Sequence, residues 1–499
     1  MNIKFNFKNK YYLYFISLII FYFFLNYKRL YLNTFNLEWF FIELINSYNT
    51  KNYYFNNDLF QNNQANSVIY PYLLNLILPN FENNYENLIY FRLVNLLAII
   101  LLIFFSIKFK ILENKNLKTL FTLIIFCPII NIYVFRIYPD ILSFTFAYLS
   151  FIFLTLEKRI FLFISFLTAC FSFLLKPVAI IIFPLFFFYI FKNNVLKKRA
   201  LFIILSYGLI IIISFYSYLK VFDIKIFSEY YSNTYVKFNL VNSITNFLSY
   251  LNYSMLLIFP FSLFYSFKFL ISKEIKIITK FLILIVSSTL TYFILNLSGE
   301  MNYGYVEKLF NYSDSKYFFI TLNNIISISF ISLILKNNKN LEKNLLYIFL
   351  TIVLFLSILI ARPVQRYLIY AMPVLFYLVI LTFNNYKFKN WLMIIYLSLF
   401  IFINTGQFVY QYNTDKIINV FKKYVIVNNL ESKTHPGQFY HSIGYLFKDY
   451  MINIILKKNN KHIENYSFQI TQCEFGKLIF KEDLYVMGKK LNIFCFSER

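Results

Sequence analysis

The chain has 499 residues, of which 59% are hydrophobic and 14% are charged, and its formal net charge is +25. A soluble domain carries about 25% charged residues, so this composition excludes an ordinary soluble protein and indicates an integral membrane protein. The positive charge does not indicate nucleic-acid binding, because the basic residues form short clusters between hydrophobic segments, as the positive-inside rule expects. We therefore expect no nucleic acid among the partners.

Hydrophobic segments recur along most of the chain. A window of about 19 residues, with short tilted spans allowed, finds about thirteen of them. They lie near residues 11–31, 89–109, 117–135, 139–156, 160–175, 177–191, 200–219, 247–267, 277–297, 317–335, 345–361, 366–383 and 391–407. The first resembles a signal peptide without a cleavage site, so we expect it to be retained as an anchor. The expected fold is an all-α polytopic membrane protein with about 13 transmembrane helices.

The charges between these segments predict an orientation. If the N-terminus is cytoplasmic, every cytoplasmic segment is short and basic, as in "KNNVLKKR" and "KNNKNLEKN". We expect a transmembrane domain over residues 1–407, with a first external loop at 32–88 that contains amphipathic helices. A C-terminal periplasmic or lumenal α/β region would follow at 408–499, because its last stretch alternates like β-structure. The expected location is a bacterial inner membrane.

Basic residues also stand at the predicted external ends of the spans, where the positive-inside rule would not favour them. They are Arg92, Arg136, Lys176, Arg362 and Arg366. One interpretation is that they snorkel or bind lipid head groups. The other is that they line one cavity and bind a lipid phosphate or pyrophosphate. Lys176 favours the second interpretation, because a strongly hydrated charge at the tip of a hairpin of short spans needs a reason.

The first external loop contains the stretch "FNLEWFFIELINSYN" at residues 35–49. Its apolar positions follow the spacing of one helix face and are Leu37, Phe40, Phe41, Leu44, Ile45 and Tyr48. Glu43 falls opposite this face, and Glu38 falls at its border beside Ile42 and Ile45. Glu38 therefore either faces protein as a functional carboxylate or only stabilises the first turn after a possible N-cap at Asn36.

A second acid and a second short helix follow in the same loop. Asp58 lies in a polar, aromatic stretch, and Tyr70-Pro71 opens an apolar segment. Taken alone, Asp58 has the features of a loop or capping residue.

Five motifs together resemble the GT-C superfamily of integral-membrane glycosyltransferases, in particular the branch of protein O-mannosyltransferases and lipid A aminoarabinose transferases. The motifs are "NLEW" at 36–39, "VIYPYLLNL" at 68–76, "IYPDIL" at 137–142, "LLKPVAI" at 174–180 and "RYLIYAMPVLFYLV" at 366–379. The layout that they mark covers most of residues 1–407. The chain departs from the family at the first acid, which is usually Asp, because here Asn36 is followed by Glu38.

The resemblance implies an enzyme that moves a sugar from a polyprenyl-phosphate donor to a glycan, lipid or protein acceptor on the external face. The implied catalytic residues are Glu38, as the general base, and Asp58, if it takes that role instead. The implied ligands of the donor phosphate are Arg136, Lys176, Arg362 and Arg366. The implied sugar or acceptor contacts are Trp39, Tyr70 and Asp140. Membrane lipids would surround the enzyme.

Two other functions are compatible with the composition. A polysaccharide polymerase or ligase would also use lipid-linked sugars, with its key arginines in one late external loop. A flippase or transporter of lipid-linked glycans would place charges in mid-span and break its helices. No cofactor motif or metal-binding cluster is evident in the sequence, which leaves a divalent metal open.

Overall fold

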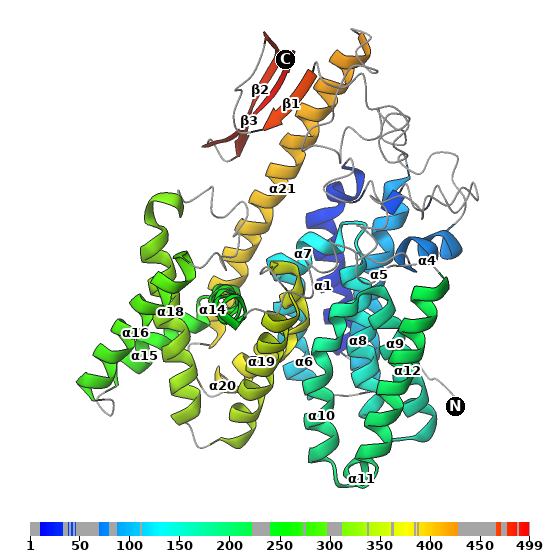
Figure 1. The fold of residues 1–499 in the computed structure, drawn as a ribbon, viewed down its shortest axis with the longest axis vertical. Coiled ribbons are helices and arrows are strands. Elements are labelled where there is room, and N and C mark those ends of the chain that lie inside the picture. The colour runs from blue at the N-terminus through cyan, green and yellow to red at the C-terminus, as the bar shows by residue number, and fades with distance from the viewer. Residues whose placement is uncertain are drawn as a thin grey trace.

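A computed structural model describes most of the chain. The described residues are 10–32, 38, 41–42, 45, 69–78, 87–109, 112–221, 240–272, 276–296, 312–336, 339–360, 364–383, 386, 389–427, 466–470, 477–486 and 489–498. Helices form a bundle, and a small β-sheet lies beyond one end of it (Figure 1).

The bundle contains α-helices and short 3₁₀ segments (η). In chain order the elements are α1 (Lys10–Asn26), η1 (Tyr27–Tyr31), α4 (Ile69–Ile77), α5 (Leu88–Lys108), α6 (Asn114–Phe126), α7 (Pro128–Val134), α8 (Pro139–Leu154), α9 (Arg159–Leu175), η4 (Pro177–Ile182), α10 (Phe183–Lys192), α11 (Asn194–Lys197), α12 (Ala200–Val221), α14 (Leu240–Leu257), α15 (Phe261–Ile271), α16 (Ile277–Asn296), α18 (Tyr312–Lys336), α19 (Asn340–Leu359), η5 (Gln365–Tyr370), α20 (Met372–Phe383) and α21 (Lys389–Val427).

The length and composition of the helices agree with an all-α polytopic membrane protein. Among the described residues, four helices are long and apolar enough to cross a bilayer, or up to six if each of two bent pairs counts as one span. Further apolar helices of 10–17 residues accompany them. Each of the predicted hydrophobic segments falls on a helix or on two consecutive helices. A total of about 13 crossings stays a prediction.

Two of the predicted spans are not straight. The pair α6 and α7 bends by 68°, and the pair α14 and α15 bends by 101°. Pro128 begins α7, and the preceding Cys127 has the extended backbone (φ −59°, ψ 125°) that a following proline favours. Pro260 precedes α15. A proline lacks the N–H that would continue the helix, and its ring collides with the preceding turn, so both breaks have a local cause.

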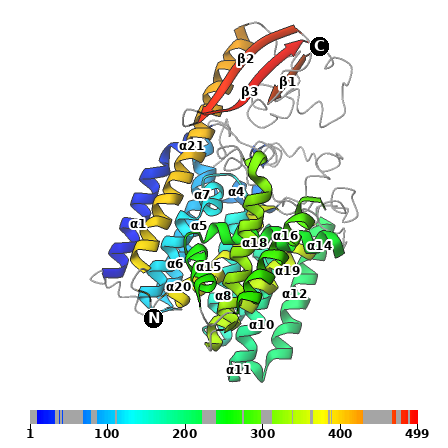
Figure 2. The same ribbon diagram turned by 90° about the vertical axis from the view of Figure 1, so that its left-hand side faces the viewer.

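The helices α8 and α9 form the hairpin on which the candidate site is built. A short turn joins them, and α5, η4 and η5 also pack against α8 or α9. Figure 1 shows α8 and α9 side by side, and Figure 2 shows α5 and α8 in the bundle below the sheet. Aromatic side chains fill the space around α8, with Phe144 in contact with both Tyr148 and Tyr370. The 3₁₀ segments η4 and η5 thus lie beside the hairpin, where they interrupt the regular α-helices of the bundle.

The described part of the first external loop includes four residues of the predicted helix. Glu38, Phe41, Ile42 and Ile45 are helical and buried. Their spacing is that of one helix face, so the carboxylate of Glu38 shares the protein-facing side with apolar neighbours. The prediction that Glu38 could face protein is confirmed. Other predicted residues of this loop, including Trp39 and Asp58, lie outside the described residues.

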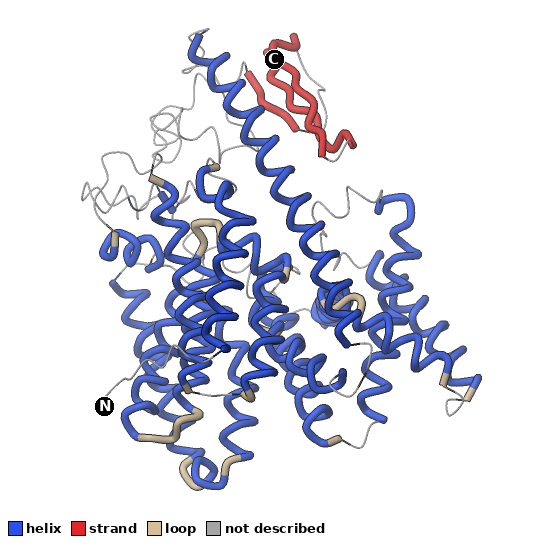
Figure 3. Tube along the Cα trace, turned by 180° about the vertical axis from the view of Figure 1, so that it is seen from behind, coloured by secondary structure: helices blue, strands red, loops and turns tan. Residues whose placement is uncertain are grey.

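The C-terminal region forms a three-stranded antiparallel sheet in the order β1–β3–β2. Its strands are β1 (Tyr466–Ile470), β2 (Lys477–Val486) and β3 (Lys489–Glu498). The sheet lies against the far end of α21, where the Asn413 side chain donates a hydrogen bond of 2.7 Å to the Tyr485 carbonyl (Figure 3). Helix α21 continues past residue 407, so the predicted last span and the support of the sheet are one helix.

A buried charge cluster as the candidate active site

Asp140 enters the bundle at the start of α8. Pro139 occupies the first helical position, where its missing N–H costs nothing, and Tyr138 before it is extended (φ −137°, ψ 142°). Asp140 therefore sits in the first turn, where the helix dipole favours a negative charge. The side chain is fully buried.

Lys176 directly follows α9, the second helix of the same hairpin. It caps α9 with an extended backbone (φ −155°, ψ 109°), because Pro177 prevents the helix from continuing. Since α8 and α9 run antiparallel, the end of α9 lies beside the start of α8. Lys176 is fully buried, and it interacts electrostatically with Asp140 and Arg366.

Arg366 approaches from η5, about 190 residues further along the chain than Lys176. Its Nε lies 3.9 Å from Oδ1 of Asp140, and its side chain is 17% exposed while that of Asp140 is fully buried. At this distance the contact is an ion pair without a hydrogen bond. The α8–α9 hairpin and the distant segment η5 thus place one carboxylate and two cations together. We call Asp140, Lys176 and Arg366 the charge cluster.

Tyrosine rings surround the cations of the charge cluster. The Arg366 guanidinium lies 5.2 Å from the ring centre of Tyr367 and 5.9 Å from that of Tyr138. The Lys176 ammonium lies 5.6 Å from the ring centre of Tyr367. Such cation–π contacts stabilise a positive charge that has lost its water. The rings therefore stabilise the buried ammonium of Lys176 and the partly buried guanidinium of Arg366.

Arg136 borders the charge cluster through Tyr133. Its guanidinium lies 5.9 Å from the ring centre of Tyr133, which also interacts electrostatically with Arg366 and Asp140. The guanidinium of Arg136 therefore belongs to the same electropositive region.

The carboxylate of Asp140 is under-satisfied for a buried acid. Among the described residues, neither of its oxygens has a hydrogen-bond partner. Buried carboxylates normally accept several hydrogen bonds, because desolvation of an unpaired charge is costly. An acid in this state is suited to accept a proton or a ligand hydroxyl, and such groups concentrate at functional sites.

Glu38 has the opposite environment. Arg92 donates two hydrogen bonds to its carboxylate, from Nη2 to Oε2 at 2.8 Å and from Nε to Oε1 at 3.1 Å. The backbone N–H of Ile137 also donates to Oε1, at 2.8 Å. Both residues of the pair are buried. The other guanidinium nitrogen of Arg92 donates to the carbonyls of residues 29, 30 and 32. Both carboxylate oxygens of Glu38 therefore already accept hydrogen bonds.

Asn95 fixes the turn at residues 136–138, which leads from α7 into Asp140 on α8. It lies one helical turn after Arg92 on α5, and its amide donates to the carbonyls of Arg136 (2.7 Å) and Tyr138 (3.0 Å). Together with the Ile137 N–H, three consecutive residues of this turn are fixed by side chains. Tyr70 lies beside the turn, within electrostatic reach of Glu38 and Asp140, and its ring meets that of Phe41 at 5.5 Å.

The predicted site residues thus divide into three groups. Arg366 forms an ion pair with Asp140, Lys176 interacts electrostatically with both, and Arg136 and Tyr70 lie at the edge. Glu38 lies one turn away, paired with Arg92, a cation that we had expected beside the lipid phosphate. Trp39, Asp58 and Arg362 lie outside the described residues. Sequence reasoning missed Asn95, Tyr138 and Tyr367; a tyrosine directly after Arg366 was visible but is too common in this chain to stand out.

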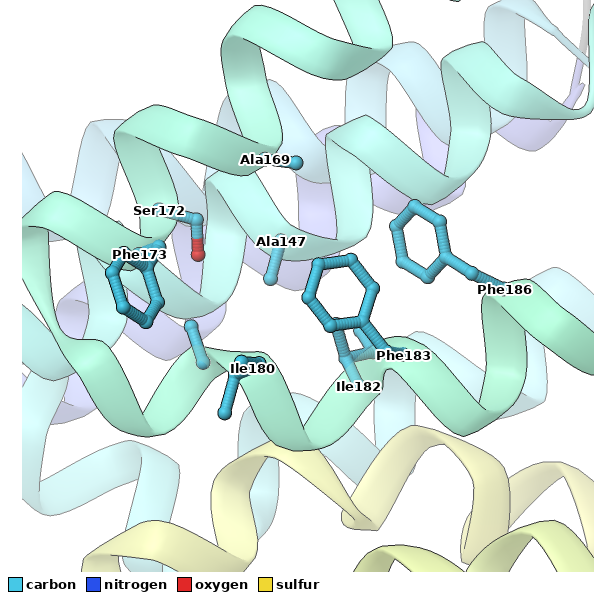
Figure 4. Close-up of a pocket in the computed structure, with 9 residues that line it drawn as sticks. Ala147, Ala169, Ser172, Phe173, Ile180, Ile182, Phe183 and Phe186 are labelled. Atoms are coloured by element: carbon cyan, nitrogen blue, oxygen red, sulfur yellow. The ribbon is translucent and has the colours of Figure 1, made fainter. Parts of the chain in front are cut away.

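A small apolar recess lies between α8, α9, η4 and α10. Its volume is about 10 Å³, which is room for about one water molecule. Figure 4 shows Phe183 and Phe186 facing Ala147 and Ala169, with the Ser172 hydroxyl on the wall. Ser172 lies one helical turn before Lys176 in the sequence.

Within the described residues, no three His, Cys, Asp or Glu side chains gather into a group that could hold a metal ion. The fold and the site define a polytopic helical membrane protein with a buried cluster of mixed charge. Comparison of the chain with protein-family models, curated proteins and solved structures finds no match.

Proposed function

We propose that the protein is a membrane glycosyltransferase that takes its sugar from a polyprenyl-phosphate donor and transfers it to a lipid, glycan or protein acceptor of the cell envelope. The convergence of Asp140 and Lys176, from the two helices of one hairpin, with Arg366, from a distant segment, is the observation that carries the proposal. Two cations can neutralise a lipid phosphate, and a carboxylate beside them can serve as a base.

In the proposed reaction, an acceptor hydroxyl gives its proton to a carboxylate as its oxygen attacks the anomeric carbon of the donor sugar. The bond between that carbon and the phosphate oxygen breaks, and its electron pair stays on the phosphate. The products are the glycosylated acceptor, with an inverted anomeric centre, and polyprenyl phosphate. Lys176 and Arg366 stabilise the charge that develops on the leaving phosphate, and Arg136 at the edge extends the positive region.

The geometry favours Asp140 over Glu38 as the base. A base needs a lone pair free to accept a proton within hydrogen-bond reach of the acceptor. Both oxygens of Glu38 already accept hydrogen bonds from Arg92 and Ile137, whereas those of Asp140 have none among the described residues. In this proposal Glu38 fixes the turn that carries Asp140. The prediction that Glu38 is the base itself remains the rival assignment.

The test is a transfer assay with the purified full chain in detergent or liposomes. Polyprenyl phosphates that carry different single sugars are offered with a membrane extract as acceptor, and free polyprenyl phosphate is measured. We expect release with at least one sugar, abolished in Asp140→Asn and in Lys176→Met. No release with any donor, from protein that still melts cooperatively, would contradict the proposal.

One observation favours a second function, the movement of lipid-linked glycans across the membrane. The pairs α6/α7 and α14/α15 are broken helices, as expected for transporters. Flipping of a fluorescent lipid-linked sugar in liposomes, without chemical change of the lipid, would identify a transporter. Cleavage of the sugar–phosphate bond would identify a transferase.

A further inference from the structure

Three hydroxyl groups lie about one turn from the charge cluster and connect the three segments that carry its residues. They belong to Ser143 on α8, Ser172 on α9 and Tyr370 in η5, and all three are buried. We call them the site layer. Ser143 is three residues after Asp140, Ser172 is four before Lys176, and Tyr370 is four after Arg366. Each charged residue therefore has one hydroxyl of the site layer about one turn away along its own segment.

The site layer is closed by mutual hydrogen bonds. Ser143 donates to the carbonyl of Ser172 at 2.9 Å, and Ser172 donates to the carbonyl of Ser143 at 2.8 Å. Tyr370 donates to the hydroxyl of Ser143 at 2.8 Å, and its own carbonyl accepts a hydrogen bond of 2.7 Å from Tyr148. The layer thus ties α8, α9 and η5 to one another at the level of the charges.

The link to Lys176 is direct. The Ser172 carbonyl that receives the Ser143 hydroxyl also receives the backbone N–H of Lys176 at 3.0 Å. The backbone at Lys176 leaves α9 at this point, so its position depends on the last turn of the helix. Because Arg366 Nε and Asp140 Oδ1 lie 3.9 Å apart and share no hydrogen bond, the site layer is a firmer link between their segments than this ion pair.

We propose that Ser143, Ser172 and Tyr370 are positioning residues that set the spacing of the charge cluster for a lipid phosphate. This inference rests on the proposed function. A phosphate held by two cations requires both at once, and a shift of about 1 Å in one of them costs much of the effect. The hydroxyls act by holding Lys176 and Arg366 in register with Asp140.

The hairpin and the adjacent helix α12 contain a matched control, which we call the reference layer. It consists of Ser150, Ser165 and Tyr207, two helical turns further from the charges. Ser150 and Ser165 donate to each other's carbonyls at 2.7 Å in both directions, and the Tyr207 hydroxyl bonds to Ser165. The two layers are alike in chemistry and burial. They differ in their distance from the charge cluster.

The experiment compares Tyr370→Phe and Ser172→Ala with Tyr207→Phe and Ser165→Ala in the detergent-purified full chain. Binding of farnesyl phosphate and of farnesol is measured by calorimetry, and thermal unfolding is recorded for each variant. We expect the site-layer variants to bind farnesyl phosphate about three- to tenfold more weakly, as the loss of one hydrogen bond allows, with farnesol binding unchanged. The reference-layer variants should lose a similar amount of thermal stability and keep their affinity for farnesyl phosphate.

Each other outcome has a distinct meaning. Equal losses of affinity in both layers would overturn the positioning role, because any weakened hairpin would then have the same effect. If the unaltered protein bound farnesyl phosphate no better than farnesol, the proposed function would fail, and the inference with it. If Ser172→Ala did not fold, Tyr370→Phe, which removes one oxygen atom, would still show whether a site-layer variant loses more affinity for farnesyl phosphate than Tyr207→Phe does.

Discussion

Glu38 and Arg92 form a buried two-point ion pair, and the same carboxylate accepts the backbone N–H of Ile137. The pair therefore joins the first external loop and α5 to the turn that leads into Asp140. A carboxylate that sequence patterning placed at the border of an amphipathic helix thus stands behind the charge cluster. The most direct consequence of the Glu38–Arg92 pair is for the stability of the fold.

Removal of one partner of this pair should destabilise the protein strongly. Glu38→Gln or Arg92→Met leaves an uncompensated buried group, so we expect each to cost about 3–5 kcal/mol of unfolding free energy. The double variant should cost little more than either single one. Thermal and denaturant unfolding in detergent measures the cycle. The exposed Lys490–Asp483 pair of the sheet is the control, with an expected coupling of about 0–1 kcal/mol; additive losses for Glu38 and Arg92 would contradict the pair's role.

The two acids should separate in kinetics. Asp140→Asn should lower kcat by about 10²–10⁴-fold, the usual contribution of a general base, and leave the binding of farnesyl phosphate within a few-fold. Glu38→Gln, assayed well below its melting temperature, should retain most of its kcat. The reverse pattern, with kcat lost in Glu38→Gln and retained in Asp140→Asn, would return the role of base to Glu38.

The cations should govern affinity for the phosphate. Lys176→Met and Arg366→Met should each weaken binding of farnesyl phosphate by about ten- to a hundredfold, since hydrogen bonds to charged groups contribute about 1.5–3 kcal/mol. Farnesol should bind all proteins equally. Lys192→Met, at the exposed end of α10, is the control for net charge. A loss of farnesol binding parallel to that of farnesyl phosphate would show that the variants damage the bundle and not a phosphate site.

Much of the bundle was predictable because a bilayer imposes length and polarity on each span. Every predicted hydrophobic segment falls on helical structure. The bends were missed, although Pro128 and Pro260 lie inside two of the predicted spans and give a local reason for them. A hydropathy average over a window of about 19 residues barely changes when one residue is a proline, so it does not indicate the bend.

The candidate site was predictable in part, for a related reason. Lys176 stood out because a buried ammonium is costly in an apolar hairpin, and Asp140 stood out after a proline. The use of Arg92 for Glu38, and of Asn95 for the turn, depends on which helices become neighbours, and no local pattern encodes that. Serines are likewise ordinary in a membrane helix until the register of α8 on α9 sets Ser143 against Ser172.

The recess predicts a cost of overpacking in the hairpin. It has room for about one water molecule, so the phenyl ring of Ala169→Phe has no free space beside Ser172 and Phe183. We expect Ala169→Phe to lower the free energy of unfolding by about 1–3 kcal/mol. Leu167→Phe, on the exposed side of α9, is the matched control and should change this free energy little. Thermal and denaturant unfolding in detergent measures both variants, and equal stability of the two would show that the recess widens to accept a larger side chain.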